Sequence, residues 1–149
     1  MTTYHELSID KLFRLDGEVA LVTGGGDGFG RIASMTYANA GASVAVTDID
    51  KTKADAVVAE IIDGGGHAVA LELDVSDRTA LKSTIDEAAS VLGGLHILVN
   101  NAGITRRGPT LDMTDDDWDS VIAVNQTAVV LGSKAAVPHM LVHGDGRII

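Results

Sequence analysis

The 149-residue chain is 46% hydrophobic and 21% charged, an ordinary globular composition that predicts one domain, residues 1–149, with a buried core. A formal net charge of −10 at pH 7 argues against nucleic acid or an anionic membrane as a partner, because few cations are available to neutralise phosphates. The absence of cysteine excludes disulfides and thiolate metal sites, and it allows a reducing compartment.

Two stretches bear on targeting and membranes. Residues 1–16 carry charges throughout and lack an apolar core of signal-peptide length. The longest apolar-rich stretch, residues 121–142, contains Asn125, Lys134 and Pro138, so we interpret it as a buried helix and not a membrane span. Pro138 should kink this helix or end it nearby. We therefore expect a cytoplasmic protein.

Short apolar strands alternate with amphipathic helices along the chain. Strands are expected at residues 19–23, 43–47, 68–73 and 95–99, with residues 147–149 as the beginning of a fifth. Helices are expected at residues 31–40, 51–63, from Ser76 or Asp77 to Leu92, and from Thr114 onward. Gly41 is expected in a left-handed conformation after the first helix. This alternation predicts an α/β fold, a doubly wound parallel sheet with helices on both faces.

Acidic and histidine clusters give no metal site. The run Asp115, Asp116, Asp117 fits the first turn of a helix, where the dipole favours negative charge. His139 and His143 have the spacing of a chelating pair on one helix face, but no third ligand accompanies them. We predict that the protein holds no metal.

Glycines and small polar residues follow four of the expected strands. The first strand runs into the glycine stretch 24–30, which leads directly into a helix, as in sites that place a phosphate at a helix N-terminus. Asp48, Asp74 and the pair Asn100–Asn101 follow the next three strands. Since ligands of open parallel sheets bind at the carboxyl ends of the strands, these residues predict one site. A merely flexible turn at the glycines is the alternative.

Asp48 lies where a carboxylate would bind a ribose 2′-hydroxyl, about 20 positions after the glycines. Asp27 adds a second negative charge inside the glycine stretch, and no Arg or Lys occupies either position. Both carboxylates would repel a 2′-phosphate, so we predict NAD in preference to NADP. The alternative for Asp48 is a turn residue in the run Asp48-Ile49-Asp50.

The spacing of these motifs resembles the short-chain dehydrogenase/reductase family. The stretch fits T-G-x-x-x-G-x-G, not the strict G-x-G-x-x-G, and residues 100–103 match the N-N-A-G motif of the family. The resemblance covers residues 15–149 and implies a parallel sheet in Rossmann order, a bound nicotinamide dinucleotide and hydride transfer between an alcohol and a ketone. The cofactor-binding residues that it implies are Thr23, Gly24, Gly26, Asp27, Gly28, Phe29, Gly30, Asp48, Ile49, Asp74, Val75, Asn101, Ala102 and Gly103.

Asn125 matches the active-site asparagine that the family keeps in its long helix, where it helps to hold water in a proton relay. From the residues alone, a buried amide satisfied by neighbouring backbone is equally acceptable, because asparagine is a poor helix-interior residue. The resemblance favours the functional role.

The catalytic Ser and Tyr-x-x-x-Lys of the family cannot be placed in this sequence. Tyr4 is followed four positions later by Ser8, and Tyr37 by Gly41. The chain ends as its fifth strand begins, so we interpret it as an incomplete polypeptide with the cofactor-binding half only. We expect no dehydrogenase turnover from it alone.

The leading hypothesis is an NAD-dependent oxidoreductase of secondary alcohols, since residues 13–17 and 101–108 resemble polyol and sugar-acid members of the family. The alternatives are an NADPH-dependent 3-oxoacyl reductase and a non-catalytic dinucleotide-binding module. Arg106 and Arg107 either meet an anionic substrate or are solvated. The resemblance also implies a homo-oligomer, a dimer or tetramer, through the helix around Trp118.

Overall fold

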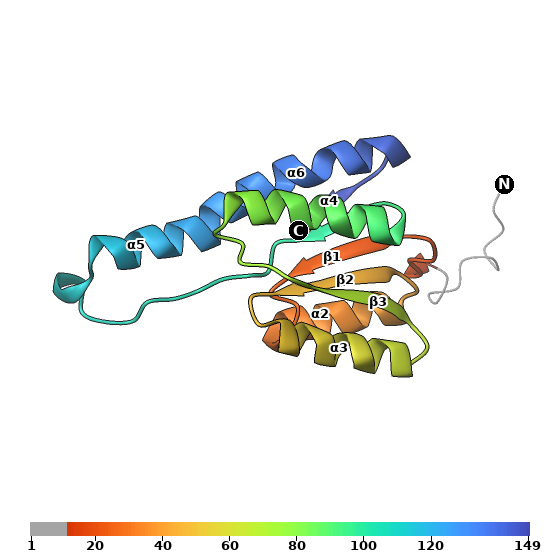
Figure 1. Ribbon diagram of the computed structural model, residues 1–149, viewed down its shortest axis with the longest axis horizontal. Helices are drawn as coiled ribbons and strands as arrows, with labels where there is room; N and C mark the ends of the chain where they lie inside the picture. The colour runs from red at the N-terminus through yellow and green to blue at the C-terminus, as the bar shows by residue number, and fades with distance from the viewer. Residues whose placement is uncertain (1–11) are drawn as a thin grey trace.

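The sheet is the centre of the molecule. A computed structural model describes residues 12–149, and most of the charged N-terminal stretch, residues 1–16, lies outside the described residues. The strands are β1 Val19–Thr23, β2 Ser43–Asp48, β3 His67–Glu72, β4 Ile97–Val99 and β5 Arg147–Ile148. All pairings are parallel, in the order β3-β2-β1-β4-β5 (Figure 1). The strand order therefore reverses at the neighbouring strands β1 and β4.

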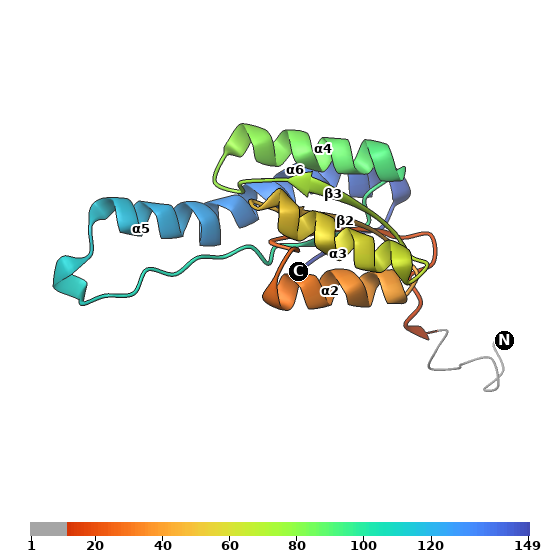
Figure 2. The ribbon, with the colours of Figure 1, turned by 60° about the horizontal axis from the view of Figure 1, so that its bottom comes forward.

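Helices cover both faces of this sheet. The helices α2 Gly28–Asn39 and α3 Lys51–Asp63 lie on one face, and α4 Arg78–Leu92 and α6 Ala128–His143 lie on the other (Figure 2). Alternation along β1 feeds two cores, because Ala20 and Val22 pack toward α2 and α3 whereas Leu21 packs toward α4 and α6. The predicted doubly wound α/β fold is confirmed.

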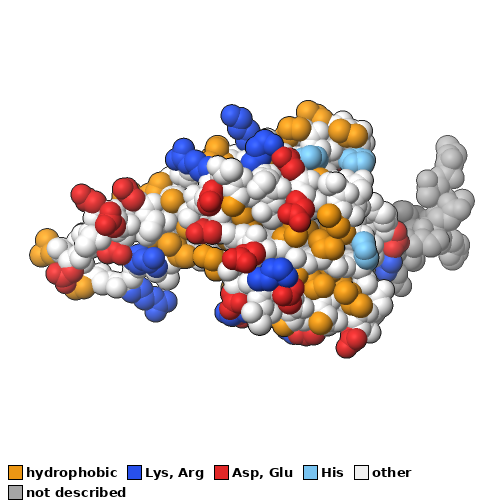
Figure 3. Space-filling model, viewed as in Figure 1, with side chains coloured by type: hydrophobic (Ala, Val, Ile, Leu, Met, Phe, Trp, Pro, Cys, Tyr) orange, Lys and Arg blue, Asp and Glu red, His pale blue; other side chains and the backbone are white. Residues whose placement is uncertain are grey.

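Between β4 and α6 the chain forms an arm that projects from the body (Figure 1). It runs outward to the 3₁₀ turn η2 Thr110–Asp112 and returns as α5 Asp115–Ile122, followed by a π-helical turn, η3 Ala123–Thr127. Asp115, Asp116 and Asp117 lie in the first turn of α5, as predicted, and Thr114 forms a capping box with Asp117 there. No residue of α5 is buried, and acidic side chains gather over its outer end (Figure 3).

The glycine stretch and the first helix overlap. The structure begins α2 at Gly28, three residues before the predicted start, because the Asp27 side chain caps the helix by accepting from the Gly28 N–H. The last glycines of the stretch are therefore the first turn of the helix. Gly41 follows the helix at φ +104°, in the left-handed region as predicted.

The prediction of a buried helix at residues 121–142 is correct for one stripe only. The buried residues of α6 recur at helical spacing, as Ala128, Gly132, Ala136 and Met140. Leu141 and Val142 are largely exposed. By length and apolar content the helical stretch Asp115–His143 could cross a membrane, a test that core helices of globular domains also pass.

Pro138 does not end this helix, which continues for another turn to a left-handed Gly144. Pro138 lies on the exposed side of α6. A proline at an exposed helix position is tolerated better than one in the core, because water can reach a carbonyl that has lost its N–H partner.

Candidate functional site

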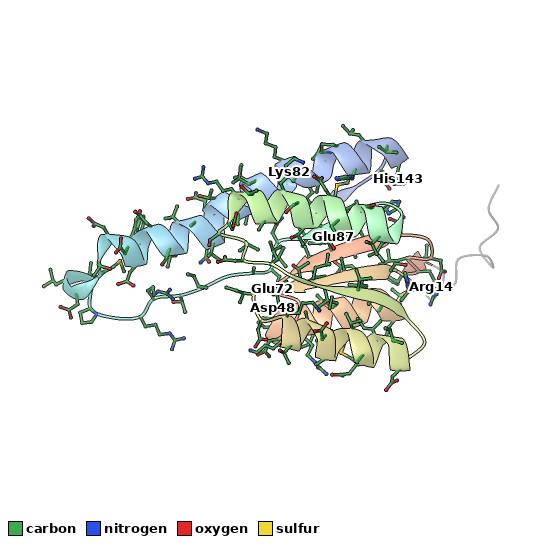
Figure 4. The ribbon with its side chains drawn as sticks, viewed as in Figure 1. Arg14, Asp48, Glu72, Lys82, Glu87 and His143 are labelled. Carbon is green, nitrogen blue, oxygen red and sulfur yellow. The ribbon has the colours of Figure 1, made fainter. Side chains whose placement is uncertain are left out.

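A cavity of about 380 Å³ opens at the carboxyl ends of the strands, where the strand order reverses. Figure 4 shows Asp48 at this end, beside Glu72, with Arg14 at the opposite end of the sheet. The lining residues are Gly24, Asp27, Gly28, Asp48, Ile49, Leu73, Asp74, Val75, Asn101, Ala102, Gly103, Ile104 and Val124. Leu73, Ile104 and Val124 carry no motif signal, because an apolar residue beside a site has the same sequence pattern as one in the core.

Four predicted cofactor residues lie outside this lining and act differently. An added Cβ on Gly30 would meet the Gly24 carbonyl oxygen at 2.0 Å, so this glycine allows α2 to approach the loop. An added Cβ on Gly26 would lie 2.7 Å from the Cβ of Lys53. Phe29 is 87% exposed, and its backbone N–H belongs to the first turn of α2, where N–H groups lack intrahelical partners.

Thr23, the fourth of these residues, is 3% exposed and ties the glycine loop to the end of β4. Its Oγ1 donates to the Val99 carbonyl at 3.2 Å and accepts from the N–H groups of Asn101 and Ala102, both at 3.0 Å. The Asn101 side-chain amide returns two bonds, to the carbonyls of Thr23 at 2.9 Å and Gly24 at 3.1 Å. The two motifs of the sequence therefore hold one another in register, and Asn101 also lines the cavity.

Asp48 serves both as a turn residue and as a wall of the cavity. One oxygen accepts from the Asp50 N–H at 3.0 Å, as the turn alternative required. The other accepts from the Gly26 N–H at 3.1 Å and so fixes the carboxylate against the glycine loop. Asp74 is held in the same manner, with Oδ1 accepting from the Ser76 N–H and hydroxyl at 2.9 and 2.7 Å.

The structure brings a cation, which no sequence motif predicted, to the corner of the cavity formed by Asp27 and Asp48. Lys53, from the first turn of α3, places its ammonium 2.9 Å from the Asp27 carboxylate. The hydrogen bond from Lys53, followed by that from the Gly28 N–H, lowers the pKa of Asp27 below its ordinary value. No Arg or Lys stands at positions 27 or 48, as the sequence analysis noted, but folding brings one from α3.

Asn125 lies in the π-helical turn and is exposed, so the buried-amide alternative is wrong in its burial. Its pairing is nevertheless with backbone, as that alternative required. Oδ1 accepts from the Ile104 N–H and Nδ2 donates to the Ile104 carbonyl, both at 2.9 Å. Asn125 thus clamps the segment that follows the N-N-A-G motif, and π-turns of this kind occur frequently at functional sites.

The remaining candidate groups lie elsewhere. Arg106 pairs with Asp117 at 3.5 Å, and with Arg107 it lines a separate hollow of about 280 Å³ on the arm. His139 bonds Asp86 at 2.8 Å, whereas His143 stacks on His96 with ring centroids 4.3 Å apart. Among residues 12–149 no cluster of three or more His, Asp or Glu could hold a metal ion.

The fold, the loop and the strand-end cavity define a dinucleotide-binding class of protein, and comparison with known sequences gives the family. The family model for the short chain dehydrogenases matches residues 18–149. The chain belongs to this family of oxidoreductases, whose members bind NAD or NADP.

Individual relatives show how much of the family the chain spans. It is 42% identical over 136 residues to a 2,5-dichloro-2,5-cyclohexadiene-1,4-diol dehydrogenase of Sphingobium indicum, covering 91% of this chain and 54% of that protein. It is 38% identical over 149 residues to the D-threitol dehydrogenase of Mycolicibacterium smegmatis, covering 100% and 57%. A crystal structure of an Escherichia coli hydroxysteroid dehydrogenase matches with a TM-score of 0.89 and 40% identity, covering 95% of this chain and 57% of that one. The chain spans about half the length of the curated relatives it matches.

Proposed function

We propose that the chain binds NAD, in preference to NADP, at the strand-end cavity and forms the cofactor half of an oxidoreductase of secondary alcohols. The observation that carries this proposal is the cavity itself, in which a glycine loop at a helix N-terminus faces two carboxylates. A bound nicotinamide dinucleotide would accept a hydride from the alcohol or donate one to the ketone.

The glycine loop fits a pyrophosphate. Gly24 and Gly28 line the cavity at φ +62° and +51°, so backbone without a Cβ faces the ligand. The first turn of α2 begins at Gly28, and its free N–H groups and positive dipole end favour a phosphate there.

The other end of the cavity fits an adenosine. Ile49, Leu73 and Val75 supply apolar contact for a flat ring beside the Asp74 carboxylate. Asp48 has its oxygens held by backbone N–H groups, so it stands ready to accept from a ribose hydroxyl. This carboxylate is the physical reason for the preference for NAD.

Asn125, the active-site asparagine that the family resemblance implies, is proposed to act in this chain as a positioning residue. Both polar atoms of its side chain already pair with Ile104, so a relay water would be held by backbone of the π-turn instead. The amide then acts by positioning the segment that joins the turn to the cavity wall.

The substrate class and the assembly follow from other observations. A polyol or sugar acid is supported by the relative named D-threitol dehydrogenase.

The exposed Leu141 and Val142 on α6, with Trp118 on α5, favour a homo-oligomer, a dimer or tetramer. The net charge of −10 argues against nucleic-acid or anionic-membrane partners. A cytoplasmic location is proposed because a chain without cysteine suits a reducing compartment. The proximity of Lys53 to the ribose corner keeps an NADPH-dependent reductase, such as a 3-oxoacyl reductase, as the second candidate.

We expect isothermal titration calorimetry to show tighter binding of NAD than of NADP. Asp48→Asn keeps the hydrogen-bonding shape but removes the charge, and it should lower the NAD-to-NADP affinity ratio by about tenfold, or about 1.4 kcal/mol. Asp55→Asn on the exposed side of α3 is the matched control and should change nothing. Absence of NAD binding, or an unchanged ratio in Asp48→Asn, would contradict the proposal.

We expect no steady NADH formation when the purified chain is incubated with NAD and a panel of polyols and sugar acids. The sequence has no Tyr-x-x-x-Lys to transfer the proton of the alcohol, so cofactor binding should occur without turnover. This result alone would also suit a non-catalytic binding module. Formation of more NADH than the amount of protein present would show turnover, and it would contradict the proposal that this chain is only the cofactor-binding half.

A further inference from the structure

Lys53 is rooted against the glycine loop by its own helix. Asp50 caps α3 by accepting from the Thr52 N–H at 3.0 Å, and the Lys53 N–H donates to the Asp50 carbonyl at 3.1 Å. The Cβ of Lys53 lies where a side chain on Gly26 would have to pass, at 2.7 Å. The backbone and Cβ of Lys53 are therefore fixed, and only the methylene groups beyond Cβ and the ammonium can change conformation.

The ammonium of Lys53 lies among three carboxylates. It bonds Asp27 at 2.9 Å, with the two side chains 49% and 72% exposed. The hydrogen bond and charge of Asp27 raise the pKa of Lys53, and the charges of Asp48 and Asp50 add to this effect. The charge of Arg31 also reaches Asp27, but Arg31 is paired with Glu60, so the group of Asp27, Asp48, Asp50 and Lys53 carries a net negative charge.

We propose that Lys53 is a specificity-determining residue of the cofactor site, a cation withheld from the ribose 2′ position by its bond to Asp27. This inference rests on the proposed function, and it goes beyond the role of Asp48. In this proposal Asp48, and not Asp27, accepts the hydrogen bond of the 2′-hydroxyl. Asp27 binds the Lys53 ammonium and adds a negative charge. Neutralising Asp27 leaves the ammonium within reach of the same corner, where a 2′-phosphate would be its new partner.

The test is a charge-neutral substitution that preserves the helix cap. Asp27→Asn retains an N-cap side chain, since asparagine caps as well as aspartate does. Calorimetry at low salt should show the NADP-to-NAD affinity ratio raised about fivefold to tenfold. The gain should shrink at high salt, because exposed charges are screened.

Two double variants locate the source of the gain. Asp27→Asn with Lys53→Met should lose the increase in the NADP-to-NAD affinity ratio. Asp27→Asn with Lys51→Met should keep it, because Lys51 lies on the same helical turn but pairs with Asp55 at 2.5 Å. Thermal melting of each variant verifies that it is folded. Lys53→Met alone leaves both helix caps intact, and it should weaken the binding of NADP about threefold more than the binding of NAD.

The outcomes are distinguishable. If the unmodified protein binds neither nucleotide, the proposed function fails and the role of Lys53 fails with it. The inference about Lys53 is overturned, while the cofactor site stands, in either of two cases. In the first, NAD binds but Asp27→Asn leaves the NADP-to-NAD affinity ratio unchanged. In the second, the double variant with Lys53→Met keeps the raised ratio.

Discussion

Gly30→Ala is expected to abolish dinucleotide binding and to destabilise the fold by about 3 kcal/mol, at the upper end of overpacking costs. The added methyl would lie 2.0 Å from the Gly24 carbonyl oxygen and 2.5 Å from the Asn101 amide nitrogen. The Gly24 carbonyl and the Asn101 amide are hydrogen-bonded to each other, so α2 must move away from β1. The glycines that line the cavity would move with it. Urea denaturation and NAD calorimetry measure the two effects.

Gly64→Ala is the matched control for Gly30→Ala. Gly64 ends α3 at φ −75°, and an added Cβ would meet its nearest atoms at 3.4 Å, an ordinary contact. Its stability should change by less than about 0.5 kcal/mol. Native-like binding by Gly30→Ala would show that the loop tolerates separation from the helix, against the account given for Gly30.

Thr23→Val is the second large effect, with an expected loss of about 2 kcal/mol in unfolding free energy. Valine keeps the shape of threonine but removes the acceptor of the Ala102 N–H and one of two acceptors of the Asn101 N–H. The Ala102 N–H is part-buried, so it loses its acceptor in a place where water replaces that acceptor incompletely. Because these bonds position the cavity wall at Ala102, NAD affinity should fall as well.

Thr47→Val separates this explanation from a general effect of losing a buried hydroxyl. Thr47 is the register neighbour of Thr23 and is fully buried, but its hydroxyl only donates, to the Val22 carbonyl at 3.2 Å. The expected cost is below about 1 kcal/mol. Equal losses in the two variants would mean that Thr23 does not tie the loops together.

Local pattern was enough for the architecture. Apolar runs, helical spacing and glycine stops placed five strands and the helices between them, with boundary errors of at most three residues. The largest errors came where local signals compete. The glycines before Arg31 were interpreted as loop although Asp27 caps a helix that begins at Gly28. The exposed position of Pro138 allowed its helix to continue, which a breaker signal in sequence does not reveal.

The motifs also located the candidate site, because residues after parallel strands share one edge of the sheet. Their separate tasks were not readable in the same way. Gly30 and Gly26 face neighbouring elements instead of the cavity, and Asn125 clamps Ile104 across the π-turn. The roles assigned to the cofactor residues and to Asn125 remain predictions until binding is measured.

The sequence by itself determined the fold class, the family and the edge of the sheet that carries the candidate site, because each depends on short-range pattern and motif spacing. Only the tertiary structure decided which groups meet there. The bond between Lys53 and Asp27 spans two helices, and the Thr23–Asn101 tie joins segments on neighbouring strands. Contacts of this kind depend on how strands and helices pack against one another, a relation that no local spacing encodes.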